Sequence, residues 1–237
     1  MVLAAGLGTR LRPITDMVPK PLVKVASRSL LDHAIDRLIA SGVKTVVINT
    51  HYLSAQIERH IADRNDILTI ISSEKASLLE TGGGVKKALG NFSGEPFYVL
   101  NADVFWLNGP TLTLNRMAEH WDDSKMDVLL LLHSTVEAYG YNGVGDFYID
   151  SIGKISRRVE NSVTPYLFTG IQIIHPRAFE GAPSGAFSLN VIYDKVIEAD
   201  RLFGIVHDGE WFHIGTPKGL AEADSYMAQR YSGKKHR

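Results

Sequence analysis

The sequence contains no cysteine in its 237 residues. This absence excludes disulfide bonds, thiolate metal sites and catalysis by a thiol nucleophile. No apolar run approaches the ~18–20 residues that a membrane span needs. The apolar start from Met1 to Ala5 is too short for a secretory signal and lacks its basic residues. Together these absences favour a cytoplasmic protein with no membrane partner.

A large net charge is also absent, because 25 basic residues face 26 acidic ones and the net charge is −1. Without a global basic field, no nucleic-acid partner is expected. Hydrophobic residues make up 45% of the chain, enough for a sizeable core in one domain of two lobes or in two domains. We find no internal repeat and no low-complexity linker, and the basic end from Ser232 to Arg237 is typical of a solvated terminus.

Strands and helices alternate in the first half of the chain. Apolar residues recur at helical spacing from Ser29 to Ser41, where Ser29 can cap the helix and Gly42 can end it. The same reading predicts strands at 1–5, 45–49, 67–71, 97–100 and 128–132, and helices at 54–64, 85–89 and 112–121. This order implies βαβ units and an α/β fold with a mainly parallel sheet covered on both faces.

The pattern changes after about His133. Closely spaced strands are predicted at 144–149, 155–160 and 169–174, followed by a helix at 189–199, a strand at 203–207 and a last helix at 217–231. The first three of these strands have no helix between them. This half therefore predicts a small α+β lobe.

Two glycines, Gly6 and Gly8, follow the first predicted strand, and the basic residues Arg10, Arg12 and Lys20 come soon after. Glycine has no Cβ, so such a loop lets backbone N–H groups approach a phosphate closely. Prolines on both sides of Lys20 exclude a long helix and hold this cation rigidly. The stretch predicts a polyphosphate site, with a glycine turn among solvated basic residues as the alternative.

The whole stretch from Leu3 to Val25, L-A-A-G-x-G-T-R-L-x-P-x-T-x-x-x-P-K-P-L-x-x-V, resembles the signature of the sugar-1-phosphate nucleotidyltransferases. The resemblance implies a Rossmann-like (GT-A-like) three-layer sandwich with a mainly parallel mixed sheet. It further implies one nucleotidyltransferase domain over residues 1–237, with a nucleotide-binding half at about 1–135 and a sugar-binding half at about 136–237. No hexapeptide repeat occurs, so the β-helix domain of some relatives is not expected.

The resemblance also implies the partners, a nucleoside triphosphate and a sugar 1-phosphate, bound by a monomer or a small homo-oligomer. Arg10 and the loop amides would hold the β- and γ-phosphates, and Lys20 would lie between the α-phosphate and the sugar phosphate. The attacking phosphate oxygen is already anionic, so catalysis depends on positioning and charge neutralisation. The nucleotide-binding residues implied are Leu3, Ala4, Ala5, Gly6, Gly8, Thr9, Glu80, Gly84 and Asn101.

Asp103 follows a predicted strand at its carboxyl end, where ligands bind in open α/β sheets. A lone carboxylate there suits Mg²⁺, which binds one or two carboxylates and substrate phosphates, whereas a turn aspartate is the alternative. The resemblance makes Asp103 the expected metal ligand. His213 stands where the family has its second metal-binding aspartate. Imidazole suits Mn²⁺ or Zn²⁺ better than Mg²⁺. Three roles therefore stay open for His213: direct metal binding, contact with a metal-bound water or phosphate, and simple packing.

Glycines also mark the other expected subsites. Gly82, Gly83 and Gly84 precede the predicted helix at 85–89, and they predict either backbone pressed against a flat ligand or a helix N-terminus open to an anion, with a mobile linker as the alternative. In the resembled family, Glu80 and Gly84 correspond to residues at the base. The residues that correspond to its sugar-binding positions are Gly145, Glu160, Thr169 and Gly170.

Within that family, the segments Leu79 to Gly84 and Phe168 to Pro176 are most similar to the uridylyltransferases that act on N-acetylmuramic acid 1-phosphate in peptidoglycan recycling. We therefore expect UTP and this sugar phosphate as substrates. A mannose- or heptose-1-phosphate guanylyltransferase is the alternative. A non-catalytic nucleotide-sugar-binding subunit is a third hypothesis, which His213 alone supports.

Overall fold

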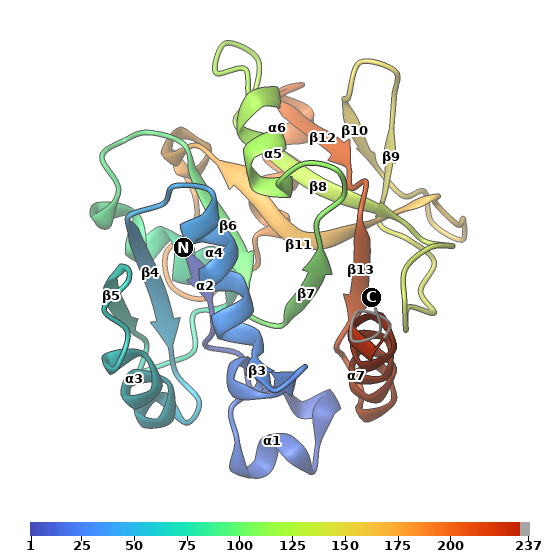
Figure 1. Ribbon diagram of the computed structural model, residues 1–237. Coiled ribbons are helices and arrows are strands. Elements are labelled where there is room, and N and C mark those ends of the chain that lie inside the picture. The colour runs from blue at the N-terminus through green and yellow to red at the C-terminus, as the bar shows by residue number, and fades with distance from the viewer. Residues whose placement is uncertain (233–237) are drawn as a thin grey trace.

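A nine-stranded mixed sheet forms the centre of the computed structural model (Figure 1), which describes residues 1–232 and leaves the predicted solvated end from Gly233 outside. The strand order is β10-β9-β11-β6-β1-β4-β5, and β8 pairs with both β11 and β12. These strands are β1 (Val2–Leu3), β4 (Thr45–Thr50), β5 (Leu68–Ser73), β6 (Phe97–Asn101), β8 (Val128–Ser134), β9 (Phe147–Ile149), β10 (Ile155–Arg157), β11 (Tyr166–Ile174) and β12 (Leu202–Val206).

Four of the five strands predicted in the first half of the chain are parallel to one another, as predicted: β6 pairs with β1, β1 with β4 and β4 with β5. In the β1 register, Leu3 lies opposite both Asn49 and Asn101. The carboxyl ends of three strands therefore meet at one edge of the sheet. Strand β11 is antiparallel to both β6 and β8, so one sheet runs through both halves of the sequence.

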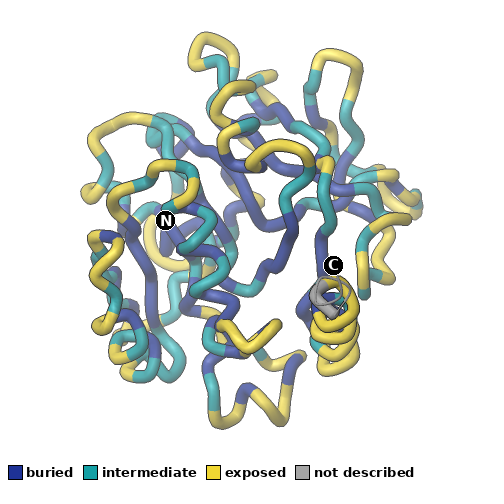
Figure 2. Tube along the Cα trace, in the orientation of Figure 1, coloured by how far each residue is buried: buried dark blue, intermediate teal, exposed yellow. Residues whose placement is uncertain are grey.

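Helices cover both faces of this sheet, which gives three layers. On one face, apolar residues of α2, α3 and α5 pack against Val46 and Ile48; on the other, those of α4 and α6 share a core with Val47. The buried strands lie between exposed helix surfaces in Figure 2. The longer helices are α2 (Leu30–Ala40), α3 (Ser54–Ala62), α4 (Glu80–Ala88), α5 (Thr113–His120), α6 (Asn190–Glu198) and α7 (Pro217–Ser232), and none within residues 1–232 is long and apolar enough to cross a membrane.

As predicted, the segment from Gly6 to Pro21 forms no long helix and contains short helical turns instead. They are η1 (Thr9–Leu11), α1 (Ile14–Met17) and η2 (Lys20–Leu22), and two further turns, η3 (Leu89–Asn91) and η4 (Pro176–Phe179), follow later. The predicted cap of α2 is confirmed, because the Ser29 hydroxyl accepts a hydrogen bond of 3.0 Å from the Asp32 N–H.

Two small antiparallel sheets were not predicted. Strand β7 (Val104–Leu107) pairs with β13 (Glu210–His213), and β2 (Lys24–Val25) pairs with β3 (Arg28–Ser29). A separate apolar core joins β7 and β13 to α7 and to the N-terminal segment, with Phe105, Phe212 and Met227 buried in it. The late segment around His213 thus lies beside residues that follow β6.

The prediction that a helix begins after the three glycines is wrong, because α4 begins at Glu80 and includes Gly82, Gly83 and Gly84. The N–H groups of Gly82 and Gly83 both donate to the Phe187 carbonyl, at 2.8 and 3.1 Å. A Cβ on Gly82 would lie 2.4 Å from the Phe187 ring. These glycines let the helix dock against the segment before α6, so the N–H groups of Gly82 and Gly83 are not free to bind an anion.

We expect Gly82→Ala to lower the free energy of unfolding by about 1–3 kcal/mol, because the added methyl group overpacks the contact with Phe187. Thermal and urea unfolding of the variant measure this loss. Gly90→Ala is the matched control, since no atom lies within 4 Å of its added Cβ. Equal stability of the two variants would show that the close approach at Gly82 is unimportant.

Candidate functional site

Two cavities open at the carboxyl edge of the parallel strands. The larger has a volume of about 430 Å³ and the smaller about 160 Å³. Both are lined by Arg10, Lys20, Asn101 and Asp103, so these four residues stand where the cavities meet. One ligand in each cavity would place their reacting ends among two cations and one carboxylate.

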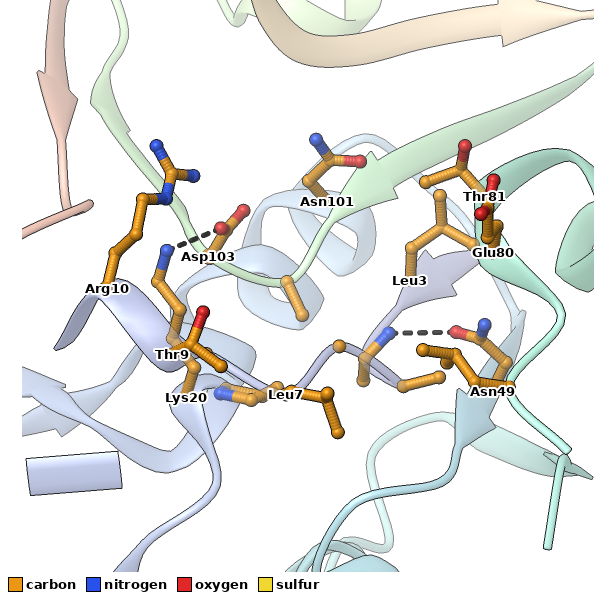
Figure 3. A pocket seen from close by; sticks show the side chains of 17 residues that line it. Leu3, Leu7, Thr9, Arg10, Lys20, Asn49, Glu80, Thr81, Asn101 and Asp103 are labelled. Atoms are coloured by element: carbon orange, nitrogen blue, oxygen red, sulfur yellow. Dashed lines mark hydrogen bonds and ion pairs between the residues drawn. The ribbon is translucent and has the colours of Figure 1, made fainter. Parts of the chain in front are cut away.

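The larger cavity has two unlike ends, as Figure 3 shows. Arg10, Lys20 and Asp103 lie at one end, where Lys20 points toward Asp103, whereas Leu3 and Glu80 lie at the other. Its walls are the N-terminal loop on one side and the start of α4 on the other. The lining residues are Leu3, Ala4, Ala5, Gly6, Leu7, Gly8, Thr9, Arg10, Lys20, Pro21, Asn49, Leu78, Glu80, Thr81, Asn101, Ala102 and Asp103.

The loop conformation depends on Gly8, whose φ of +65° is in the left-handed region. A Cβ there would lie 3.0 Å from the Lys20 Cβ, so the loop rests directly on the lysine stem. The Thr15 hydroxyl donates to the Gly8 carbonyl at 2.8 Å. Turn and lysine are therefore held as one unit.

Lys20 is 8% exposed, and its Nζ lies 2.6 Å from Oδ2 of Asp103. A buried ammonium group without an anion would be strongly destabilising, so this contact fixes the lysine head at the junction of the cavities. Arg10 is exposed and lines both cavities. The site thus combines one fixed cation with one that can follow a ligand.

The donor set at this junction fits a metal ion that arrives with its substrate. Among residues 1–232, no group of three or more His, Cys, Asp and Glu side chains could enclose a metal. Asp103 offers a single carboxylate beside a cavity large enough for phosphates, and Mg²⁺ commonly binds through one or two carboxylates plus phosphate oxygens.

His213 lines the smaller cavity, and its backbone pairs with that of Val104, the neighbour of Asp103. Burial lowers the pKa of the His213 imidazole, and the positive charges of Arg10 and Lys20 lower it further against the opposing effect of Asp103. A neutral ring at neutral pH follows. A Cβ on Gly215 would lie 2.1 Å from the ring Nε2, so the imidazole packs directly over this glycine.

The floor of the smaller cavity is an irregularity in β11, whose register shifts between Phe168 and Gln172. Gly170 has a φ of +84° there, and a Cβ on it would lie 2.8 Å from the Asn101 amide nitrogen. The Thr169 carbonyl accepts a 3.1 Å hydrogen bond from the Trp211 indole. The remaining walls are aromatic and apolar, formed by Val104, Tyr141, Phe168, Trp211, Phe212 and Ile214.

Three residues of the predicted site lie outside both cavities. Gly84 is buried in α4. Gly145 is buried and donates its N–H to the Tyr141 hydroxyl at 3.1 Å, so it reaches the smaller cavity through that ring. Glu160 is exposed in a turn after β10. The other predicted residues line one cavity or both.

Sequence reasoning missed Asn49 and Leu78, which line the larger cavity, and it gave no separate role to Thr81 of the Leu79 to Gly84 segment, which lines it too. Asn49 had a usable signal, because a polar residue at the end of a buried β-branched strand lies at the edge where ligands bind. Its side-chain oxygen accepts a 2.8 Å hydrogen bond from the Ala4 N–H, which ties β4 to the start of the loop. Leu78 precedes the Leu79 to Gly84 segment and carried no distinct signal.

The fold resembles that of a solved UDP-glucose pyrophosphorylase in complex with UDP-glucose, with a TM-score of 0.79, 17% identity and coverage of 97% of each chain. In sequence, the chain is 36% identical to an N-acetylmuramate alpha-1-phosphate uridylyltransferase of Caulobacter vibrioides, over 97% of this chain and 96% of that protein. A uridylyltransferase of the same name from Neisseria meningitidis serogroup B is 33% identical, over 95% and 96%.

A mannose-1-phosphate guanyltransferase beta-B of Xenopus laevis is 30% identical over 92% of this chain but 61% of that protein. The sequence model described as nucleotidyl transferase matches residues 1–230, which include every residue that lines the two cavities. With this match and the near full-length likeness to the uridylyltransferases, the chain belongs to the nucleotidyl transferase family of enzymes.

Proposed function

We propose that this protein transfers the uridylyl group of UTP to a sugar 1-phosphate, with N-acetylmuramic acid 1-phosphate as the preferred acceptor, and releases pyrophosphate. The observation that carries the proposal is the meeting of two cavities at Arg10, Lys20 and Asp103. The larger cavity suits a nucleotide and the smaller a sugar, so both phosphates would come together at the shared cations. The full-length likeness to uridylyltransferases supports the choice of substrates.

In this proposal the chain positions two anions for in-line attack and neutralises the charge that builds between them. Lys20, fixed by Asp103 and the glycine turn, lies where the α-phosphate and the sugar phosphate would meet. Arg10 and the amides of the Gly6 to Thr9 loop would hold the leaving pyrophosphate. No general base is needed, because the sugar phosphate oxygen is already anionic.

Asp103 would hold Mg²⁺ together with phosphate oxygens, and the ion would supply further neutralisation of charge on the phosphates. Because imidazole is a poorer ligand for Mg²⁺ than a carboxylate, we assign His213, which lines the smaller cavity near Asp103, a contact to a water or phosphate rather than direct binding of the metal. Mn²⁺ is the other ion that this donor set could accept.

A guanylyltransferase is the second candidate, and Glu80 favours it. This side chain lines the larger cavity at the end away from Arg10. A carboxylate accepts hydrogen bonds only, so it matches the adjacent N–H donors of guanine better than uracil, whose single imino group lies between two carbonyl oxygens. UTP remains our first choice because the relatives that match over almost their whole length are uridylyltransferases.

We further propose that the protein acts in the cytoplasm, in peptidoglycan recycling, as a monomer or small homo-oligomer. Its single domain would bind nucleotide through residues 1–135 and sugar mainly through residues 136–237. Supporting this division, strands β1, β4 and β6 edge the larger cavity, and β11 and β13 line the smaller one.

Pyrophosphate release from the four nucleoside triphosphates, each with a panel of sugar 1-phosphates, tests the choice of substrates. We expect the highest kcat/KM with UTP and N-acetylmuramic acid 1-phosphate. Activity with GTP and a mannose or heptose phosphate, with none for UTP, would establish the guanylyltransferase instead. Calorimetric binding of a nucleotide sugar without turnover in Mg²⁺ or Mn²⁺ would establish the non-catalytic alternative.

Lys20→Ala and Arg10→Ala are each expected to lower kcat at least ~100-fold, by analogy with the loss of one donor that stabilises transition-state charge. Steady-state kinetics with saturating substrates measure the loss. Arg12→Ala is the control on the same loop, because Arg12 pairs with Asp16 at 3.1 Å on the surface and lines neither cavity. Near-normal kcat in either test variant contradicts the assigned roles.

A further inference from the structure

Glu74 is a buried carboxylate that lines neither cavity, and it is 2% exposed. We propose that it is a positioning residue that ties the two walls of the larger cavity together and so fixes the width available to a nucleotide. The inference rests on the proposed function only in taking this cavity as the nucleotide site. It holds for any base.

Each oxygen of the Glu74 carboxylate reaches one wall. Oε1 accepts a 2.7 Å hydrogen bond from the Asn49 amide, whose own oxygen accepts from the Ala4 N–H at 2.8 Å, at the start of the glycine loop. Oε2 accepts a 2.9 Å hydrogen bond from the Leu79 N–H, between Leu78 and Glu80 of the opposite wall. One side chain therefore links both sides of the cavity from behind.

The direction of these hydrogen bonds fixes the Asn49 side chain. A carboxylate accepts and does not donate, so Asn49 must turn its NH₂ group toward Glu74 and its oxygen toward the Ala4 N–H. Glu74 also lies next to the first residues of α4, where the helix dipole favours a negative charge. Both side-chain oxygens of Glu74 must therefore act as hydrogen-bond acceptors.

Gly84 provides the space for this contact. A Cβ on Gly84 would lie 2.8 Å from the Asn49 amide nitrogen and 2.8 Å from Oε1 of Glu74. Any larger residue would press between the two hydrogen-bonded groups. Gly84 thereby affects the larger cavity without lining it.

Glu74→Gln is the test. The NH₂ group of the new glutamine must face a hydrogen-bond donor, which is either the Asn49 NH₂ group or the Leu79 N–H. If the Asn49 side-chain amide flips to compensate, its NH₂ group faces the Ala4 N–H, and the hydrogen bond from Ala4 is lost. We expect the KM for the triphosphate to rise about tenfold, as for loss of one buried hydrogen bond. We call the hydrogen bonds of Glu74 to Asn49 and Leu79 the clamp. The kcat and the KM for the sugar 1-phosphate should change less than about twofold, because the clamp joins only the walls of the larger cavity.

Hydrogen exchange of the Ala4 amide gives a readout that needs no substrate. This amide is buried, and we expect its exchange in Glu74→Gln to be at least ~10-fold faster than in the unmodified protein. Glu119→Gln, an exposed change of the same chemistry on α5, is the control and should alter neither readout. If the exchange rate of the Ala4 amide is unchanged in Glu74→Gln, the proposed role of Glu74 is wrong.

Testing Glu74→Gln in a chain that already carries Asn49→Asp shows whether the direction of the hydrogen bond between the two side chains matters. Asn49→Asp sets two carboxylates against each other, and adding Glu74→Gln then restores a donor between them. We expect Glu74→Gln to raise the triphosphate KM in the otherwise unmodified chain and to lower it in the chain that already carries Asn49→Asp. The same direction of change in both backgrounds would rule out the clamp.

The outcomes separate the two proposals. If the unmodified protein turns over none of the four triphosphates, the proposed function fails, and Ala4 exchange still decides the clamp. If Glu74→Gln does not fold, Gly84→Ala carries the same exchange test, with Gly90→Ala as its control. Equal rises in the KM for both substrates, together with a lower kcat, would mean general structural damage and no clamp.

Discussion

The contact between the Lys20 ammonium and the Asp103 carboxylate is the interaction on which the site depends. It joins the N-terminal segment to the residues after β6 at 2.6 Å, where the two cavities meet. Because the ammonium group is buried, it needs an anion beside it, and Asp103 supplies this anion as long as no substrate phosphate is bound. The Gly8 turn and the flanking prolines matter because they bring this one cation to this one place.

The sheet supplies the other half of the arrangement. Leu3, Asn49 and Asn101 lie side by side in the register, so three strand ends present backbone and amide groups along one edge. The pairing of β7 with β13 then brings His213 beside Asp103 from more than a hundred residues further along the chain. The junction between the cavities is therefore built from local turns on one side and from long-range strand pairing on the other.

Local chemistry explains which parts of the site the sequence could predict. Arg10, Lys20 and Asp103 follow short patterns of glycine, proline and strand ends, and each lines both cavities. Glu74 acts through hydrogen bonds to Asn49 and Leu79, which belong to other segments of the fold, and β7 and β13 are short strands whose pairing depends on tertiary contacts. Such contacts leave no local pattern, so these residues could be located only in the fold.

Glycine shows the limit of local patterns most clearly, because one residue type does opposite things in this chain. Gly8 bends the backbone toward the cavity, whereas Gly82 and Gly84 allow close packing behind it. That packing has a consequence for the end of the larger cavity at Glu80. Glu80 has a φ of +58°, which a non-glycine residue adopts at a cost, and the hydrogen bonds of Leu79 and Gly82 hold the backbone on either side of it. The direction of the Glu80 carboxylate therefore depends on two residues, Leu79 and Gly82, that do not line the larger cavity.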